Sequence, residues 1–285
     1  SAASTAATWN QSTASIASGS SGGSSGSMRV ETGVSNSGTS GALSLGSGEA
    51  RAGSAGSVTL VGGANLKPAL LHLALEFASH AVGADSGADA LCKLGKDPLA
   101  VIGDMDSIDV SVIAQIPKQR IHRINDQDST DFEKCLMRLE APVLICVGFL
   151  GGQVHHQMAA LTALIRNAHK RCILLGEEDI VFVIPPKLSL DLEAGVRVSL
   201  YPMAKCRIHS HGLHWPTTAI DFSPDGKVGT SNKSTGPIRL MPDCPKMLAI
   251  LPLECLTLVL EALMKEPQWS VGQVLDSNRI NSLAR

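Results

Sequence analysis

Residues 143–149, Val-Leu-Ile-Cys-Val-Gly-Phe, form the apolar segment that decides the fold class of this 285-residue chain. A nearly continuous apolar run of this length is typical of a strand that is covered on both faces, as in a parallel sheet. Pro142 ends the helical pattern that precedes the segment, and Gly151-Gly152 turns the chain into the next helical pattern. Strands that alternate with helices predict an α/β domain with a parallel sheet and right-handed crossovers.

The same alternation extends outward from this segment in both directions. The clearest helix begins at Thr130, which forms a capping-box pattern with Glu133 ahead of an apolar stripe. Further helices are predicted from apolar residues at helical spacing. The predicted strands of this part are 58–61, 81–84, 99–102, 120–124, 143–149 and 172–175.

After about residue 179 the pattern changes to short apolar segments separated by Pro, Gly and Asp turns, which predicts a small antiparallel β domain. Its predicted strands are 181–184, 188–192, 196–201, 219–222 and 247–251. A helical tail follows to about residue 265. We therefore divide the chain into a Ser/Gly/Ala-rich segment at 1–57, which we expect to be disordered, an α/β domain at 58–178, a β domain at 179–253 and a tail at 254–285.

Composition excludes several classes of partner. The formal net charge is −2, so no basic field would attract nucleic acid or an anionic membrane. No uninterrupted apolar run reaches the length of a membrane span. The chain has 7 cysteines without a C-x-x-C pair, which favours reduced thiols and a cytoplasmic location.

Acidic residues follow the carboxyl ends of successive predicted strands, where an open α/β sheet binds its ligands. They are Asp85, Asp104, Asp106, Asp126, Asp128 and Asp131. Carboxylates gathered at one edge repel one another unless a hard cation lies between them, and Mg²⁺ prefers such oxygen ligands. Since Mg²⁺ usually accompanies phosphates and the chain has no P-loop motif, we expect a magnesium–phosphate site of another type. For each aspartate alone, a turn-forming or helix-capping role is the alternative.

The acidic segments resemble the motifs of a known family. Residues 84–88, 103–107 and 126–131 are similar, in order and separation, to the acidic motifs of thiamine pyrophosphokinases. Residues 212–216 and 229–232 resemble the two motifs of that family's β domain. The resemblance extends over most of the chain beyond the Ser/Gly/Ala-rich segment.

The resemblance implies a catalytic α/β domain, a C-terminal β-sandwich and a homodimer whose active sites form between subunits. It implies transfer of a pyrophosphoryl group from Mg·ATP to the hydroxyl of thiamine, which leaves AMP. The acids that would place Mg²⁺ and the phosphates are Asp85, Asp104, Asp106 and Asp131, with Asp126 and Asp128 beside them. Gln127 would make a polar contact, and Asp131 or Asp106 would accept the hydroxyl proton.

The resemblance of the β-domain motifs implies which residues would contact thiamine. Trp215 would stack on the cationic thiamine ring, a good partner for an aromatic face, with Ser231 and Asn232 nearby. Taken alone, Trp215 is better explained as a packing or interface residue.

One segment departs from the family. Its Gly-Gly-Arg-x-Asp-His motif appears here as residues 151–156, with Gln153 at the Arg position and His155 at the Asp position. The sequence of residues 148–152 is otherwise most similar to that of bacterial members of the family. Because a neutral amide replaces a phosphate-binding guanidinium, a catalytically weak or silent thiamine- or nucleotide-binding protein is the main alternative. His155 and His156 are interpreted either as substitute cationic contacts or as a polar helix start.

Two further hypotheses remain. A phosphohydrolase or nucleotide-sugar transferase would use Asp104-Met105-Asp106 alone. His209, His211 and His214 invite a zinc interpretation, but no further ligand is evident in the sequence, so a solvated strand edge is the alternative.

Overall fold

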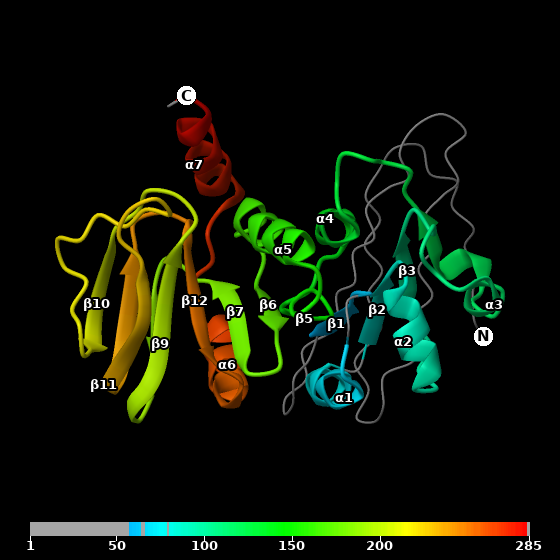
Figure 1. Cartoon of the computed structure of the whole chain (residues 1–285), viewed down its shortest axis with the longest axis horizontal. Coiled ribbons are helices and arrows are strands. Elements are labelled where there is room, and N and C mark those ends of the chain that lie inside the picture. The colour runs from blue at the N-terminus through cyan, green and yellow to red at the C-terminus, as the bar shows by residue number, and fades with distance from the viewer. Residues whose placement is uncertain (1–56, 64–65, 79, 284–285) are drawn as a thin grey trace, which may run out of the picture.

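The computed structural model describes residues 57–63, 66–78 and 80–283. The predicted disordered segment at 1–57 lies outside these residues except for Ser57. The described part is built on a 12-stranded sheet in the order β10-β11-β9-β12-β7-β6-β5-β1-β2-β3-β4, with β8 paired to β11 (Figure 1).

The parallel half of the sheet contains the strands predicted from the alternating pattern, with all neighbours parallel. These strands are β1 (Val58–Val61), β2 (His80–Ala84), β3 (Ala100–Gly103), β4 (Ile121–Arg123), β5 (Leu144–Val147) and β6 (Cys172–Leu175). The chain runs from β1 outward to β4 and then returns to the other side of β1 as β5. The order therefore reverses between β1 and β5, and the carboxyl ends of these strands border the crevice where such sheets bind ligands.

Helices cover both faces of this half. They are α1 (Pro68–Phe77), α2 (Gly87–Lys93), α3 (Val110–Ile113), α4 (Asp131–Arg138) and α5 (Val154–Arg166), with a 3₁₀ turn η1 (Lys118–Arg120) before β4. On one face Leu71 of α1 belongs to the same core as Ile173 of β6. On the other face Phe132 of α4 and Leu164 of α5 pack with Leu60 of β1. In Figure 1, α4 and α5 lie above the sheet and α1 lies below it.

The antiparallel half continues the same sheet. It consists of β7 (Asp179–Val183), β8 (Leu188–Leu190), β9 (Ala194–Pro202), β10 (Ile208–Leu213), β11 (Gly229–Pro242) and β12 (Met247–Pro252). β7 pairs antiparallel with β6, with Phe182 opposite Ile173, so the boundary predicted near residue 179 falls where parallel pairing ends. The first part of β11 pairs with β9 and its last part pairs with β8.

The predicted strand at 219–222 is wrong. Ala219 has φ 61°, a left-handed conformation that interrupts an extended chain, and Phe222 forms only isolated bridges with Cys206 and Lys227. Conversely, no strand was predicted over the residues that form β10 and β11. β11 buries the polar side chains of Asn232 and Ser234 in its first part, so the apolar alternation that would reveal a strand is missing there.

The C-terminal tail is helical, as predicted to residue 265, and then continues beyond the predicted end. It contains η2 (Leu253–Cys255), α6 (Leu256–Lys265) and α7 (Val271–Leu283). α6 packs on the face of the sheet that α1 also covers, and Trp269 donates a hydrogen bond from Nε1 to the carbonyl of Ile184 at 2.9 Å. None of the helices in the described part of the chain has the length and apolar character that crossing a membrane requires.

Candidate active site

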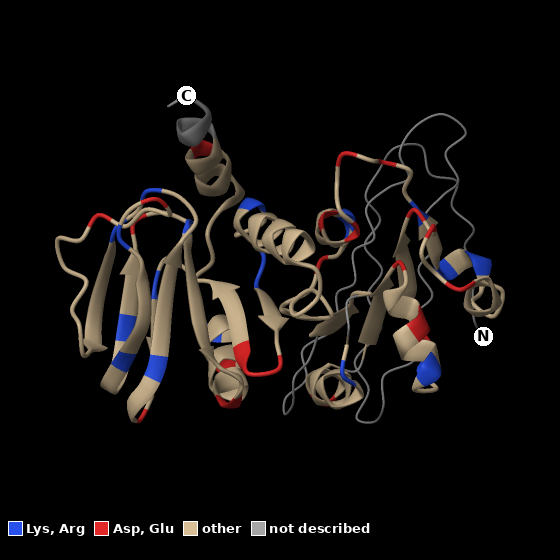
Figure 2. Ribbon diagram, viewed as in Figure 1, with Lys and Arg blue, Asp and Glu red and all other residues tan. Residues whose placement is uncertain are grey.

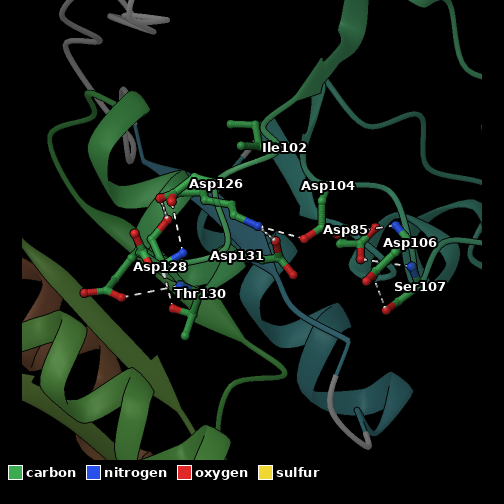
Figure 3. Close-up of polar contacts among 12 residues, drawn as sticks. Asp85, Ile102, Asp104, Asp106, Ser107, Asp126, Asp128, Thr130 and Asp131 are labelled. Atoms are coloured by element: carbon green, nitrogen blue, oxygen red, sulfur yellow. Dashed lines mark hydrogen bonds and ion pairs between the residues drawn. The ribbon is translucent and has the colours of Figure 1, made fainter. Parts of the chain in front are cut away.

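Three of the predicted aspartates come together because their strands are neighbours. Asp85 follows β2, and Asp104 and Asp106 follow β3, which pairs with β2 in parallel. The backbone N–H of Asp85 continues this pairing, donating to the carbonyl of Ile102 at 2.9 Å. One carboxylate oxygen from each of the three aspartates lies within 4.8 Å of the others (Figure 3). We call these residues the acid cluster.

The turns that carry the acid cluster are conformationally unusual. Asp85 has φ 44° and Met105 has φ 65°, both in the left-handed region that residues with a side chain rarely adopt. Such conformations cost about 1–3 kcal/mol each and occur preferentially at functional sites. Gly103 lies between these turns, and a Cβ there would approach Asp85 Cβ at 2.9 Å and Asp131 Oδ1 at 3.2 Å. The glycine therefore lets the strand end and the acids of two other elements pack closely.

Asp85 is the buried member of the cluster, with 3% of its surface exposed. Its Oδ2 accepts a hydrogen bond from the backbone N–H of Ser107 at 3.2 Å, whereas the buried Oδ1 has no hydrogen-bond partner. Burial, followed by the nearby charge of Asp131, raises the pKa of Asp85 to about 6. A buried carboxylate oxygen without a donor, facing other carboxylates, has the chemistry of a ligand for a hard divalent cation such as Mg²⁺. The residues of the acid cluster therefore fit the predicted metal.

Asp131 approaches the cluster from α4 and is joined to it by a lysine. Lys134 Nζ lies 2.9 Å from Asp104 Oδ2 and 3.0 Å from Asp131 Oδ1. The ammonium hydrogen bond lowers the pKa of Asp104. Burial alone would lower the pKa of Lys134, but its hydrogen bonds to the two aspartates outweigh burial and raise it. Lys134 was missed in the sequence, although its position one helical turn after Asp131 is the signal that could have found it.

The remaining acids of the third motif lie apart from the cluster. Asp126 accepts hydrogen bonds from the backbone N–H of Asp128 at 3.0 Å and from the hydroxyl of Ser129. The Ser129 hydrogen bond lowers the pKa of Asp126. Asp126, Gln127 and Asp128 are exposed on the loop before α4, and Figure 3 shows Asp126 and Asp128 pointing away from the three clustered acids. In this arrangement Asp126 acts as a turn former, which is the structural alternative weighed for a single aspartate.

Charge is distributed unevenly over the two halves of the molecule. The ribbon in Figure 2 shows Asp and Glu positions on the loops around β3 and α4, and Lys and Arg positions along β9 and β11, although each half also carries residues of the other sign. The loops at the carboxyl ends of the parallel strands thus carry one group of acidic residues.

The segment that departs from the family begins α5, next to the carboxyl end of β5 and so at the same edge of the sheet as the acid cluster. Gln153 is the exposed residue before the first turn, and its side chain makes no capping hydrogen bond. His155 and His156 are exposed, with ring centroids 4.2 Å apart. This placement fits both the polar helix start and the ligand-contact interpretation.

A cavity of about 230 Å³ lies at the reversal of strand order, beside the same edge. Its lining comes from the loops after β5 and β6 and from the start of α1, and it includes Lys67, Gly148, Gly151 and Glu177. Sequence reasoning did not find this cavity, because it depends on which strands are neighbours.

The β-domain residues form a separate group. Trp215 is 55% exposed, and its backbone is held by Asn232, whose side chain accepts from Trp215 N at 3.1 Å and donates to Trp215 O at 2.8 Å. Ser231 has φ 62°, and its N–H donates to Ser199 Oγ at 2.9 Å. The His214 ring meets Trp215 edge-on, with centroids 4.5 Å apart. The structure thus presents an exposed aromatic face held from behind by a buried amide.

The histidines of this region do not form a metal site with other ligands. His209 and His211 are exposed on β10, and among the described residues the close group of possible ligands consists of the acid cluster alone. The solvated-edge interpretation is therefore the one that agrees with the structure.

The two groups lie on opposite halves of the sheet within one chain. The acid cluster follows β2 and β3, whereas Trp215 and Asn232 belong to the region of β10 and β11, with β9, β12, β7, β6, β5 and β1 between them. Figure 1 shows β10 and β3 toward opposite ends of the molecule.

Comparison with known proteins agrees on the α/β region. Residues 71–175 match the family described as thiamin pyrophosphokinase, catalytic domain. A thiamine pyrophosphokinase of Oryza sativa subsp. japonica is 29% identical over 154 residues, covering 47% of this chain and 58% of that protein. One of Arabidopsis thaliana is 26% identical over 155 residues with the same shares. The chain therefore spans somewhat more than half the length of these curated relatives.

Solved structures show the same fold. A thiamin pyrophosphokinase from Geobacillus thermodenitrificans superposes with a TM-score of 0.58 at 21% identity, covering 69% of this chain and 96% of that one. The thiamin pyrophosphokinase from Candida albicans has a TM-score of 0.58 at 15% identity, covering 69% and 88%. The likeness supports the mixed α/β architecture with its β-rich C-terminal part. The catalytic-domain match over residues 71–175 and the sequence relatives both indicate the thiamine pyrophosphokinase family, and the solved structures agree with it in fold.

Proposed function

We propose that the chain transfers a pyrophosphoryl group from Mg·ATP to the hydroxyl of thiamine, giving thiamine diphosphate and AMP. The observation that carries this proposal is the acid cluster, whose buried Asp85 Oδ1 lacks a partner, inside the region that matches the family's catalytic domain.

In this proposal Asp85, Asp104 and Asp106 hold Mg²⁺. When bound, Mg²⁺ would supply the positive charge that a triphosphate needs for transfer. Asp104 and Asp106 are kept in place by the turn after β3, where Asp106 Oδ1 accepts from the Ser107 hydroxyl at 2.8 Å. Asp131, which lies on α4 rather than on the strand ends that carry the acid cluster, would accept the hydroxyl proton of thiamine. Asp106 is the alternative acceptor. Asp126 and Asp128 would act by shaping the loop that presents Gln127.

Trp215 would bind thiamine by stacking. Its exposed ring offers a flat, electron-rich face to a cationic heterocycle, and the buried Asn232 holds the backbone beneath it by two hydrogen bonds. Ser231 lies beside Asn232 on β11 and would contribute a polar contact. Because this face and the acid cluster are at opposite halves of one chain, we propose a homodimer in which each site combines one subunit's acids with the other's Trp215.

The 7 cysteines that the structure leaves as free thiols support a reducing compartment, and we propose a cytoplasmic location.

The test of the function is thiamine-dependent AMP formation from Mg·ATP, followed by chromatography of both products. We expect thiamine diphosphate and AMP in equal amounts, and loss of both in Asp104→Asn. Absence of thiamine diphosphate at high protein concentration would refute the proposal. Release of inorganic phosphate without thiamine would instead favour the phosphohydrolase hypothesis.

The second candidate function is thiamine or nucleotide binding without efficient turnover. Gln153 and His155 favour it, since neither supplies the fixed guanidinium that binds phosphate in a fork. The double variant Gln153→Arg, His155→Asp tests it beside the parent protein, with calorimetric thiamine binding measured for both. A parent that turns over as fast as the double variant would contradict this second candidate.

A further inference from the structure

Lys134 is the one charged group of α4 that is buried against the acid cluster, with 3% of its surface exposed. Its ammonium is fixed from two sides, at 2.9 Å from Asp104 Oδ2 and at 3.0 Å from Asp131 Oδ1. A lysine is rarely buried to this extent unless it is paired, so these two contacts are what keep it there. The ammonium therefore lies between Asp104 and Asp131. Figure 3 shows Asp131 to one side of Asp104 and shows Asp85 and Asp106 to the other.

This contact divides the four nearby carboxylates into two sets. Asp85, Asp104 and Asp106 each direct an oxygen into the common space within 4.8 Å, whereas Asp131 lies outside that group. Asp104 belongs to both sets, because it is a member of the acid cluster and its Oδ2 also contacts Lys134, as Asp131 does. Its Oδ1 accepts from the backbone N–H of Asp106 at 3.4 Å. The lysine thus occupies the position on the Asp131 side of Asp104 where a second cation would otherwise find two carboxylates.

We propose that Lys134 is a positioning residue that acts as a built-in counter-cation, reserving Asp131 and restricting divalent cations to Asp85, Asp104 and Asp106. The inference rests on the proposed function of the same site and deepens it, because it assigns Asp131 to substrate rather than to metal. It also changes the expectation from the sequence, in which Asp131 was a metal ligand. The reserved Asp131 keeps a carboxylate free of metal for the hydroxyl that reacts.

Removing Lys134 should change the affinity for the cation and the stability of the protein in opposite directions. A positive charge close to a cation site weakens binding of the cation by Coulomb repulsion, so removing Lys134 should tighten it. The same removal leaves Asp104 and Asp131 unpaired in a partly buried place and should lower the stability of the metal-free protein. If Lys134 had a merely structural role, its removal would lower stability and metal affinity together.

The experiment titrates the whole 285-residue chain with Mn²⁺ alone, without nucleotide, and measures free Mn²⁺ by electron paramagnetic resonance. For Lys134→Met we expect about tenfold tighter Mn²⁺ binding than in the wild type, together with a lower Tm in EDTA. Lys134→Arg keeps the charge and should return both values toward those of the wild type. A folded Lys134→Met whose affinity is unchanged or weaker overturns the inference.

Asp131→Asn supplies a separate measurement if Lys134→Met fails to fold. Because Asp131 is held by the lysine and is not a metal ligand, Mn²⁺ affinity should stay within about threefold of the wild type, whereas Asp104→Asn should lose at least about tenfold. An equally large loss in Asp131→Asn would show that Asp131 ligates the metal and would overturn the inference.

The controls separate this inference from the proposed function. If the wild type binds no Mn²⁺, the metal site of the proposed function is itself wrong. If the wild type binds Mn²⁺ and Lys134→Met behaves like it, only the role of Lys134 fails. AMP formation is measured independently of both outcomes.

Discussion

At the scale of single residues, Asp85 combines three features that oppose stability. Its backbone is left-handed, its carboxyl is buried and one of its oxygens has no partner. Each of these features is unfavourable in a protein that binds nothing at that point. Together they support the proposal that a bound cation compensates the charge of this carboxylate.

The raised pKa of Asp85 makes a signed prediction about stability. Between pH 4 and about 6 the folded state holds the proton that the unfolded state has released, so stability should fall as pH rises through this window. The shift from 3.8 to about 6 corresponds to about 3 kcal/mol as an upper estimate. In EDTA, Asp85→Asn should therefore be more stable than the wild type at pH 7.5 and should lose most of the difference at pH 4.

Urea unfolding at the two pH values checks this. Asp128→Asn, which changes an exposed acid of the same edge, is the matched control and should leave the pH dependence unaltered. Mg²⁺ should stabilise the wild type and not Asp85→Asn. An Asp85→Asn protein with the wild-type pH dependence would show that burial of this carboxyl is not the cause.

Trp215 supports a second prediction at this scale, which concerns binding. Loss of a cation–π stack costs about 0.5–2 kcal/mol, so Trp215→Ala should raise the KM for thiamine about 2–30-fold and leave the KM for ATP unchanged. Trp215→Phe keeps an aromatic face, so its KM for thiamine should lie between those of the wild type and Trp215→Ala. Steady-state AMP formation with each substrate varied in turn measures both constants, and equal changes in both would contradict stacking on thiamine.

At the scale of elements, α4 carries one feature that the sequence predicted and one that it did not. The capping box predicted from the sequence is present: Thr130 Oγ1 accepts from Glu133 N at 3.2 Å, and Glu133 Oε2 accepts from Thr130 N at 3.4 Å. A capping box is a local pattern, so sequence is sufficient to find it. The ion pair of Lys134 with Asp104 depends on how α4 docks on β3, which the sequence does not contain.

The same distinction explains the rest of the fold. The acid cluster was predictable because parallel strands place their carboxyl ends at one edge, whatever their order. The displacement of Asp126 and Asp128 from it was not, because their loop satisfies its own hydrogen bonds. β11 was not recognised because it buries Asn232 and Ser234 where a strand pattern calls for apolar residues.

The cap of α4 gives a prediction for this scale. Thr130→Ala should cost about 1 kcal/mol of unfolding free energy, because Glu133 N loses its acceptor. Thr130→Ser keeps the acceptor oxygen and should cost much less. Denaturant unfolding with both variants measures the difference, and equal stability of the two would show that the hydroxyl contributes nothing.

At the scale of the molecule, a single hydrogen-bonded sheet separates the acid cluster from the aromatic face. β6 and β7 pair through Leu174 and Val181, both buried, so the two halves are joined by backbone hydrogen bonds and a common core. A hinge between them would have to break this pairing. An active site that needs both groups is therefore more readily completed by a second subunit than by folding of one chain onto itself.

This argument predicts complementation between two defective variants. Asp104→Asn lacks a metal ligand, and Trp215→Ala lacks the thiamine face. In a mixed dimer, one site joins both defects, while the other joins the intact acids of one subunit to the intact Trp215 of its partner. Random mixing should give about a quarter of the wild-type sites, since half of the dimers are mixed and each has one intact site.

The two variants are co-expressed with different affinity tags, and AMP formation is measured at a thiamine concentration below KM, where Trp215→Ala alone is weakest. Dimers purified through both tags should then carry about half of the wild-type activity per dimer. If each subunit instead contained a complete site, every site in the mixture would keep one defect. Activity of the doubly tagged dimers no higher than the mean of the two parent variants would therefore place the acids and Trp215 of one site in the same chain.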